Sequence, residues 1–136
     1  DLIATVLNGG TFIWDTSAGT SNRATAVSNA PTASRFSLVS TDTRHLLIFG
    51  TETTIGNTST QDDLLFRFSD REDATDYTPV ATNEAGSLRI SDGSKIIGAV
   101  KSTGQMLVWT DTSLHGIQFV GTPLLLVLDN LALTVG

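Results

Sequence analysis

Cysteine is absent from this 136-residue sequence, and lysine occurs only twice, as Lys95 and Lys101. Without thiols the chain has no disulfide framework and no thiolate metal site, and the redox compartment is left open. Threonine and serine are abundant instead, and β-branched threonine packs well on a pleated sheet while long helix-forming side chains are scarce. The composition therefore favours strands and turns over helices.

Basic residues are also few, since eight lysines and arginines against fourteen acidic residues give a formal net charge of −6. A general nucleic-acid-binding surface needs a basic face that displaces counterions from phosphates, so such a surface is not expected here. An acidic wall repels DNA, and the charge is compatible with a channel that DNA passes in passive contact.

No apolar run is long enough to cross a membrane. The longest, residues 124–133, is about half the length of a bilayer-spanning helix and contains Asp129 and Asn130. No basic segment followed by an apolar run opens the chain, so no signal peptide is expected. The sequence starts and stops abruptly, and we expect residues 1–136 to be a single all-β region within a longer chain.

The clearest structural signal lies in residues 104–119, which predict two strands joined by a turn at residues 111–113. Asp, Thr and Ser at this turn bond their own backbone and favour a reversal of direction. The continuous apolar run at residues 106–109 predicts a strand buried on both faces, and the looser pattern at residues 114–119 predicts a strand nearer the surface. Residues 8–10, Asn-Gly-Gly, predict a second hairpin turn, because asparagine and glycine tolerate positive φ.

Apolar strands that end in an aromatic residue recur at Trp14, Phe49, Phe68 and Trp109. Short antiparallel strands with a recurring aromatic near a turn are typical of β-propeller blades. We therefore predict an all-β fold of antiparallel, propeller-like blades, about two to three in this chain; a β-sandwich of the same strands is the alternative. Because a closed propeller has at least about four blades, these blades belong to a longer chain or close with other chains.

Chemistry-bearing residues form no recognisable motif. His45 and His115 lack metal-ligand spacing, and the acidic run at residues 70–76 has Thr75 where a calcium loop needs glycine. The run is better explained as a solvated loop, and His115 as a packing residue. We predict no catalytic, cofactor-binding or metal-binding residue and no enzymatic activity.

The aromatic residues divide into two predicted roles. Tyr77 lies in a polar loop and is the candidate for an exposed contact. Five other aromatic residues end apolar strands and are predicted to be structural residues of the core: Trp14, Phe49, Phe68, Trp109 and Phe119.

A resemblance to a known class rests on motifs in fixed order along most of residues 10–123. These motifs are residues 68–73, 82–87, 91–93, 96–99, 107–114 and 118–121, with residues 28–31 and 44–50 upstream. In this order they resemble bacteriophage virion proteins of the tail hub or nozzle (tail tubular) class, whose propeller-like domains surround the genome exit channel. After Pro123 the run 124–136 is almost purely aliphatic apart from Asp129 and Asn130, which departs from the polar and aromatic residues expected of further propeller strands.

The resemblance implies a structural role in the virion, in the phage tail. It implies assembly with other copies of the chain and with neighbouring phage tail proteins, with no cofactor. Two alternatives stay open: a carbohydrate- or receptor-binding module of a phage tail that uses Tyr77, and a polysaccharide-degrading enzyme.

Overall fold

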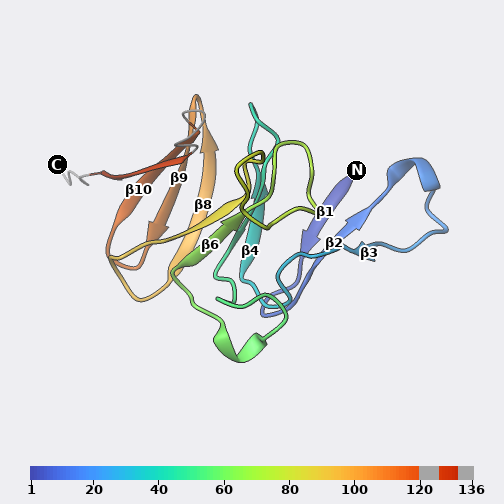
Figure 1. Ribbon diagram of the computed structural model, residues 1–136, viewed down its shortest axis with the longest axis horizontal. Coiled ribbons are helices and arrows are strands. Elements are labelled where there is room, and N and C mark those ends of the chain that lie inside the picture. Colours follow the sequence, from blue (N-terminus) through green and yellow to red (C-terminus); the bar gives the residue numbers. More distant parts are fainter. Residues whose placement is uncertain (120–125, 132–136) are drawn as a thin grey trace.

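The computed structural model describes residues 1–119 and the backbone of residues 126–131, and it consists of three small antiparallel sheets (Figure 1). The first sheet has the order β1-β2-β3. Its strands are β1 (Leu2–Thr5), β2 (Thr11–Trp14) and β3 (Thr25–Ala26).

The middle sheet has the order β4-β5-β6-β7, so each strand pairs with the next strand along the chain. Its strands are β4 (Phe36–Val39), β5 (Leu46–Phe49), β6 (Leu65–Phe68) and β7 (Gly86–Arg89). Hairpin connections of this kind need no crossover, because antiparallel neighbours can be joined directly.

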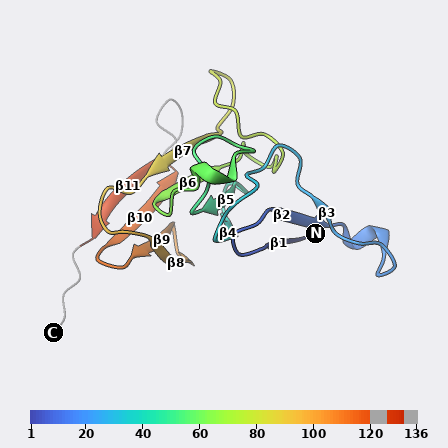
Figure 2. The same ribbon diagram turned by 90° about the horizontal axis from the view of Figure 1, so that it is seen from below.

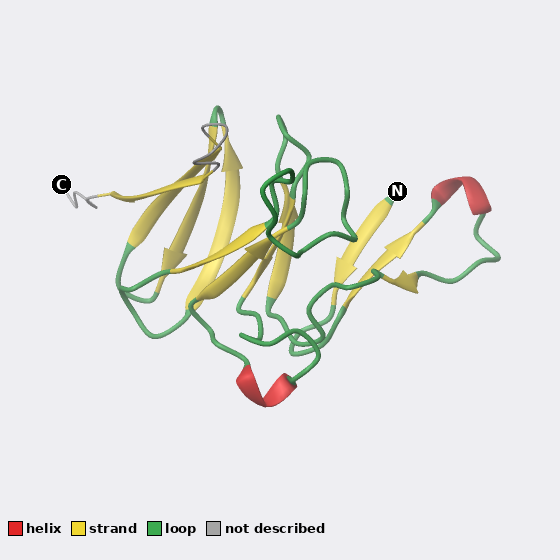
Figure 3. Ribbon diagram, viewed as in Figure 1, coloured by secondary structure: helices red, strands yellow, loops and turns green. Residues whose placement is uncertain are grey.

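The third sheet repeats this plan with the order β8-β9-β10-β11. Its strands are β8 (Ile96–Ser102), β9 (Gln105–Thr110), β10 (Leu114–Phe119) and β11 (Leu126–Leu131). A β-bulge between Ile96 and Gly98 shifts the register where β8 begins. The two three-residue 3-10 helices, Thr16–Ala18 and Thr58–Thr60, lie in connections (Figure 3).

Tight turns occur where the sequence places residues that tolerate positive φ. Asn8 has φ 59°, and Val6 N–H donates to Gly10 O at 3.0 Å, which closes the predicted hairpin between β1 and β2. At the β9–β10 turn, Thr110 Oγ1 accepts from the backbone N–H of Ser113 at 3.0 Å. Both predicted turns are confirmed.

The middle sheet is covered on both faces, which makes the molecule a stack of three layers. All four residues of β5 are buried. Leu47 and Phe49 belong to the core shared with the third sheet, while Leu46 and Ile48 belong to a second core that Ile3 and Ile13 of the first sheet border. Successive side chains of β5 point to opposite faces of the middle sheet, so this one strand packs toward both the first and the third sheet.

The first strands of the three sheets lie next to one another. The central strand β4 contacts β1 on one side and β8 on the other, and Figure 2 shows the later strands of each sheet extending away from this line. The prediction of an all-β antiparallel fold is confirmed, and none of the three sheets closes on itself.

Two details of the strand predictions are wrong. In β9 only Met106 and Val108 of the apolar run are buried, because Leu107 and Trp109 point to the opposite, half-covered face. β10 is not a surface strand, since it lies between β9 and β11 and buries His115 and Ile117. In the aliphatic run 124–136, the structure has one strand, β11, which includes Asp129 and Asn130; residues 124–125 and 132–136 lie outside the described residues.

Across the described ranges, 1–119 and 126–131, no helix has the length and apolar character that a membrane crossing requires.

Candidate functional site

The most elaborate polar arrangement centres on His45, which the turn between β4 and β5 places inside the protein. Arg44 adopts φ 54° and lets the chain reverse directly before His45. The His45 backbone N–H donates to Ser40 Oγ at 2.9 Å, and Ser40 N–H donates back to His45 O at 2.9 Å. The ring is fully buried, with an exposed fraction of 0%.

Each nitrogen of the His45 ring faces a different partner. Nδ1 lies 2.6 Å from Thr43 Oγ1, which in turn lies 2.7 Å from Ser40 Oγ. Nε2 lies 2.9 Å from Glu84 Oε2, but the carboxylate is out of line with the ring N–H, so the two groups are in close polar contact without a well-directed hydrogen bond. A carboxylate beside Nε2 favours the proton on that nitrogen, which leaves Nδ1 to accept from the threonine hydroxyl.

Glu84 is itself fixed by two further groups. Arg71 Nε donates to Glu84 Oε2 at 3.1 Å, and Arg71 Nη2 donates to Oε1 at 3.3 Å. The Glu84 backbone N–H donates to Asp70 Oδ1 at 2.8 Å. Burial lowers the pKa of His45, and the Glu84 carboxylate opposes this effect only in part. The imidazole is therefore neutral near pH 7.

An aromatic cluster links this polar group to the third sheet. Phe119, the last residue of β10, stacks on His45 with ring centroids 4.2 Å apart and planes 8° from parallel. Phe68 of β6 meets Phe119 edge-on at 6.0 Å. Such contacts stabilise beyond the area they bury, so the three rings fix the middle sheet against the third.

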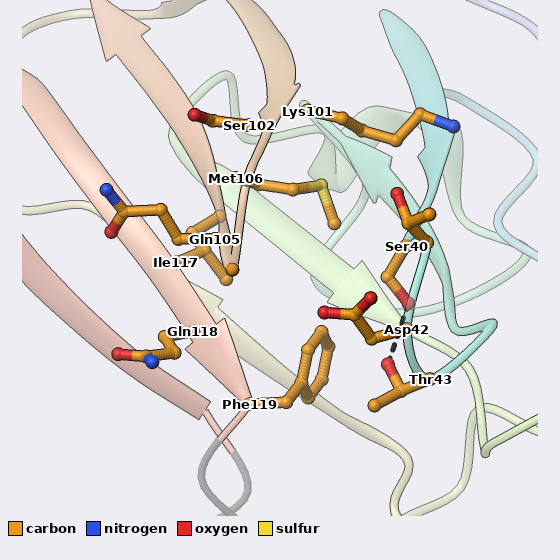
Figure 4. A pocket seen from close by; sticks show the side chains of 12 residues that line it. Ser40, Asp42, Thr43, Lys101, Ser102, Gln105, Met106, Ile117, Gln118 and Phe119 are labelled. Carbon is orange, nitrogen blue, oxygen red and sulfur yellow. Dashed lines mark hydrogen bonds between the residues drawn. The ribbon is translucent and has the colours of Figure 1, made fainter.

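Beside Phe119 a small cleft opens between the middle and third sheets, with a volume of about 80 Å³ (Figure 4). Met106, Ile117 and Phe119 form its apolar wall. Its polar lining comes from the β4–β5 turn on one side and from the β8–β9 hairpin and β10 on the other: Ser40, Asp42, Thr43, Lys101, Ser102, Gln105 and Gln118. The volume suits a small polar group or a few waters.

The order hydroxyl, imidazole, carboxylate in Thr43, His45 and Glu84 is the order used in nucleophilic catalysis. Two features distinguish this arrangement from an activated nucleophile. The Thr43 hydroxyl is shared with Ser40, and the carboxylate that would orient the imidazole is held by Arg71. The arrangement is best suited to fixing the β4–β5 turn against the loop that carries Glu84.

Tyr77 is not an exposed contact, and that prediction is wrong. Its exposed fraction is 3%, and it packs in the second core with Leu46 and Ile48. The polar loop that carries it lies on the middle sheet, and Asp73 and Asp76 accept hydrogen bonds from the loop's own backbone N–H groups at Thr75 and Thr78. Burial, with a further contribution from Asp73, raises the pKa of the Tyr77 phenol.

The five structural aromatics separate into two groups. Phe49 and Phe68 are buried in the core, as predicted, and Phe119 is half-buried against it. Trp14 and Trp109 are only half-buried, so their placement in the core is wrong. Each occupies an outward position of its strand, opposite to the residues that pack on the middle sheet.

The acidic side chains at residues 70–76 accept hydrogen bonds from backbone and hydroxyl groups of the surrounding loop. Asp70 Oδ1 accepts from the backbone N–H groups of Arg71 and Glu84, and Asp73 Oδ1 accepts from the Thr75 hydroxyl at 2.6 Å. In the part of the chain that the structure describes, no three acidic or histidine side chains are grouped to hold a metal ion.

Sequence reasoning missed two carboxylate groups that contact distant segments of the chain. One is Glu84 beside His45; the other is Glu52, which is fully buried and accepts from Thr32 N–H at 2.6 Å and Gly56 N–H at 2.9 Å. Neither residue lies in a periodic or spaced motif, so no pattern in the sequence predicts these contacts.

Comparison with known proteins gives no relative: no family model, no curated protein and no solved structure matches this chain.

Proposed function

We propose that this chain is a structural component of a bacteriophage tail, of the hub or nozzle type, which assembles with other subunits around the genome exit channel. The proposal starts from the ordered motifs between residues 10 and 123 that resemble this class. The observation that carries it furthest is the stack of three meander sheets whose first strands, β1, β4 and β8, lie side by side. Sheets stacked around a common line of first strands are what propeller-like blades require.

The layer count supports propeller-like blades over the β-sandwich alternative. A sandwich has two packed sheets, each with one face toward solvent. Here the middle sheet packs on both sides, through Leu47 and Phe49 on one face and Leu46 and Ile48 on the other.

The charge distribution supports a passive relation to DNA. Three arginines are neutralised by ion pairs with carboxylates: Arg35 with Asp63, Arg71 with Glu84, and Arg89 with Asp62. Arg67 donates to the carbonyl oxygens of Glu52 and Thr53. Paired arginines leave less free positive charge for phosphates, and the net charge of −6 repels them.

Location in the particle is the direct test. Particles of the tailed phage that encodes this sequence are labelled with an antibody raised against the purified chain and imaged by electron microscopy. We expect label on the tail, and none after the antibody has been absorbed with purified chain. Label confined to the head, or particles without the chain by mass spectrometry, would contradict the proposal.

The relation to DNA has a separate test in a filter-binding assay with duplex DNA at physiological salt. We expect no retention of DNA at micromolar protein, because few basic groups are free to displace counterions. Tight, salt-sensitive retention would overturn the passive-channel role.

A carbohydrate- or receptor-binding role is the second candidate, and the cleft beside Phe119 is the observation that favours it. Amides at Gln105 and Gln118 and the Asp42 carboxylate are the groups that bond sugar hydroxyls, and Phe119 adds an apolar wall. A glycan array that shows selective binding, lost in Gln118→Ala and kept in Val80→Ala, would support this role. An array without binding would exclude it for the glycans present.

A further inference from the structure

The outward positions of three strands of the third sheet are apolar, whereas the edge strand β11 has Asp129 opposite Gly116, at a further outward position of the register. Outward positions of β8, β9 and β10 carry Val100, Leu107, Trp109 and Leu114, and Val100 is 48% exposed. These positions in the three strands include no charged residue. The Trp109 ring lies over Gly98 of the neighbouring strand, where an added Cβ would stand only 2.7 Å from Trp109 Cζ2.

The middle sheet has an equivalent aromatic face, and there the next sheet covers it. Phe49 of β5 pairs with Phe36 and Phe66, as Trp109 of β9 pairs with Gly98 and Leu114. Phe49 is the last residue and Trp109 the next to last of the second strand of a four-stranded meander, and both face away from the preceding sheet. Phe49 is fully buried because the next sheet packs on it. Trp109 occupies the equivalent position in the third sheet, so we expect one more sheet to pack on the face that carries Trp109.

The opposite end of the stack offers a matching surface. Ile3 and Ile13 border the core under the first sheet, so the alternate residues of β1 and β2 face outward. Leu2 pairs with Trp14 at this outer face, and Leu2 is 59% exposed. The outward positions of these two strands, Leu2, Ala4, Phe12 and Trp14, carry no charge. Burial of this face would therefore leave no unpaired charge on β1 or β2.

We propose that the Trp109 face of the third sheet packs against the Leu2 and Trp14 face of the first sheet in a second copy of the chain. Stacking within the chain is directional, because each sheet contacts the next sheet along the chain through one face and the preceding sheet through its other face. A second copy that continues this stacking would bring the free face of the third sheet of one copy against the free face of the first sheet of the other, head to tail. Two copies of the described three-sheet region would then place six sheets in one closed ring, which lies within the range of four to eight blades typical of propellers. The inference rests on the proposed function only in taking the chain to be a subunit that assembles with itself.

The mass in solution is the first test. By light scattering after size-exclusion chromatography, we expect twice the 14.4 kDa of one chain. Leu2→Asp and Val100→Asp each introduce a charge at an exposed position of one face, and each is expected to be monomeric. Val80→Asp is the matched control, because Val80 is 54% exposed but lies in a loop outside both faces, and it is expected to remain dimeric. Circular dichroism confirms that each variant is folded.

Mixing the two monomeric variants tests the direction of assembly. Leu2→Asp keeps its Trp109 face and Val100→Asp keeps its Leu2 face, so a mixture retains one intact contact and is expected to form a weaker mixed dimer. A wild-type monomer would overturn the inference. So would a dimer that Val100→Asp disrupts and Leu2→Asp does not, because identical faces would then meet. Label on the phage tail with a monomeric wild-type chain would overturn the inference and leave the proposed function standing.

Discussion

His45 shows how a single buried side chain can make stability depend on pH. The pKa of His45 lies below its ordinary value of 6.5, chiefly because burial disfavours the charged imidazolium. The groups that face it are Thr43 at Nδ1 and Glu84 at Nε2, with Arg71 and Asp70 beyond. As pH falls, the unfolded chain takes up the proton first.

We therefore expect His45 to contribute stability that is fully present above about pH 6.5 and is lost as pH falls from there through the lower folded-state pKa. The slope from one group is at most about 1.4 kcal/mol per pH unit. Urea unfolding of wild type and His45→Gln between pH 5 and 8 measures it. The two curves should run parallel above about pH 7, with the wild type falling more steeply below about pH 6.5. Curves that stay parallel to pH 5 would show that His45 is not the group responsible.

At the scale of the strand, close contacts between neighbouring strands decide which residues are accepted. Gly86 of β7 lies opposite Phe68 of β6 in the ladder. A Cβ added at Gly86 would stand 2.7 Å from Phe68 Cζ and 3.1 Å from Cε2. Phe68 is buried between the middle and third sheets, so its ring has little room to move.

We expect Gly86→Ala to destabilise the protein by about 1–3 kcal/mol, the usual cost of overpacking a core. Gly10→Ala is the matched control, because no atom lies within 4 Å of its added Cβ and the residue does not have positive φ. Thermal unfolding of both variants gives the comparison. Equal melting temperatures for the two variants would contradict the close packing of Phe68 against β7.

The whole molecule depends on the middle sheet, because both cores include residues of β5. Leu47 belongs to the core with the third sheet, and Ile48 to the core that the first sheet borders. Loss of packing on one face of β5 therefore also weakens the packing on its other face. The three sheets are therefore expected to unfold together.

Leu47→Ala and Ile48→Ala should each destabilise the protein by about 2–5 kcal/mol, since both side chains are fully buried. Each should shift one cooperative transition, seen at the same midpoint by far-UV circular dichroism and by tryptophan fluorescence from Trp14 and Trp109. The tryptophans lie in the two outer sheets, so separate transitions for the two probes in either variant would show that the sheets unfold independently.

Much of the fold follows from local properties that the sequence carries by itself. Threonine-rich apolar segments predict strands, and Asn8, Asp111 and neighbouring residues predict turns, because these preferences act within a few residues of the chain. The strands of the middle sheet, and the hairpins at Asn8 and Asp111, were predictable for this reason.

Only the tertiary structure decided which face of each strand is covered and which distant groups meet. Tyr77 is buried because its loop folds onto the middle sheet, and Trp14 and Trp109 are half-exposed because they occupy outward positions at the two ends of the stack. The contact between His45 and Glu84 joins a strand turn to a distant loop. Such contacts depend on how sheets stack, and the period of a single strand shows that two faces differ without showing which of them another layer will cover.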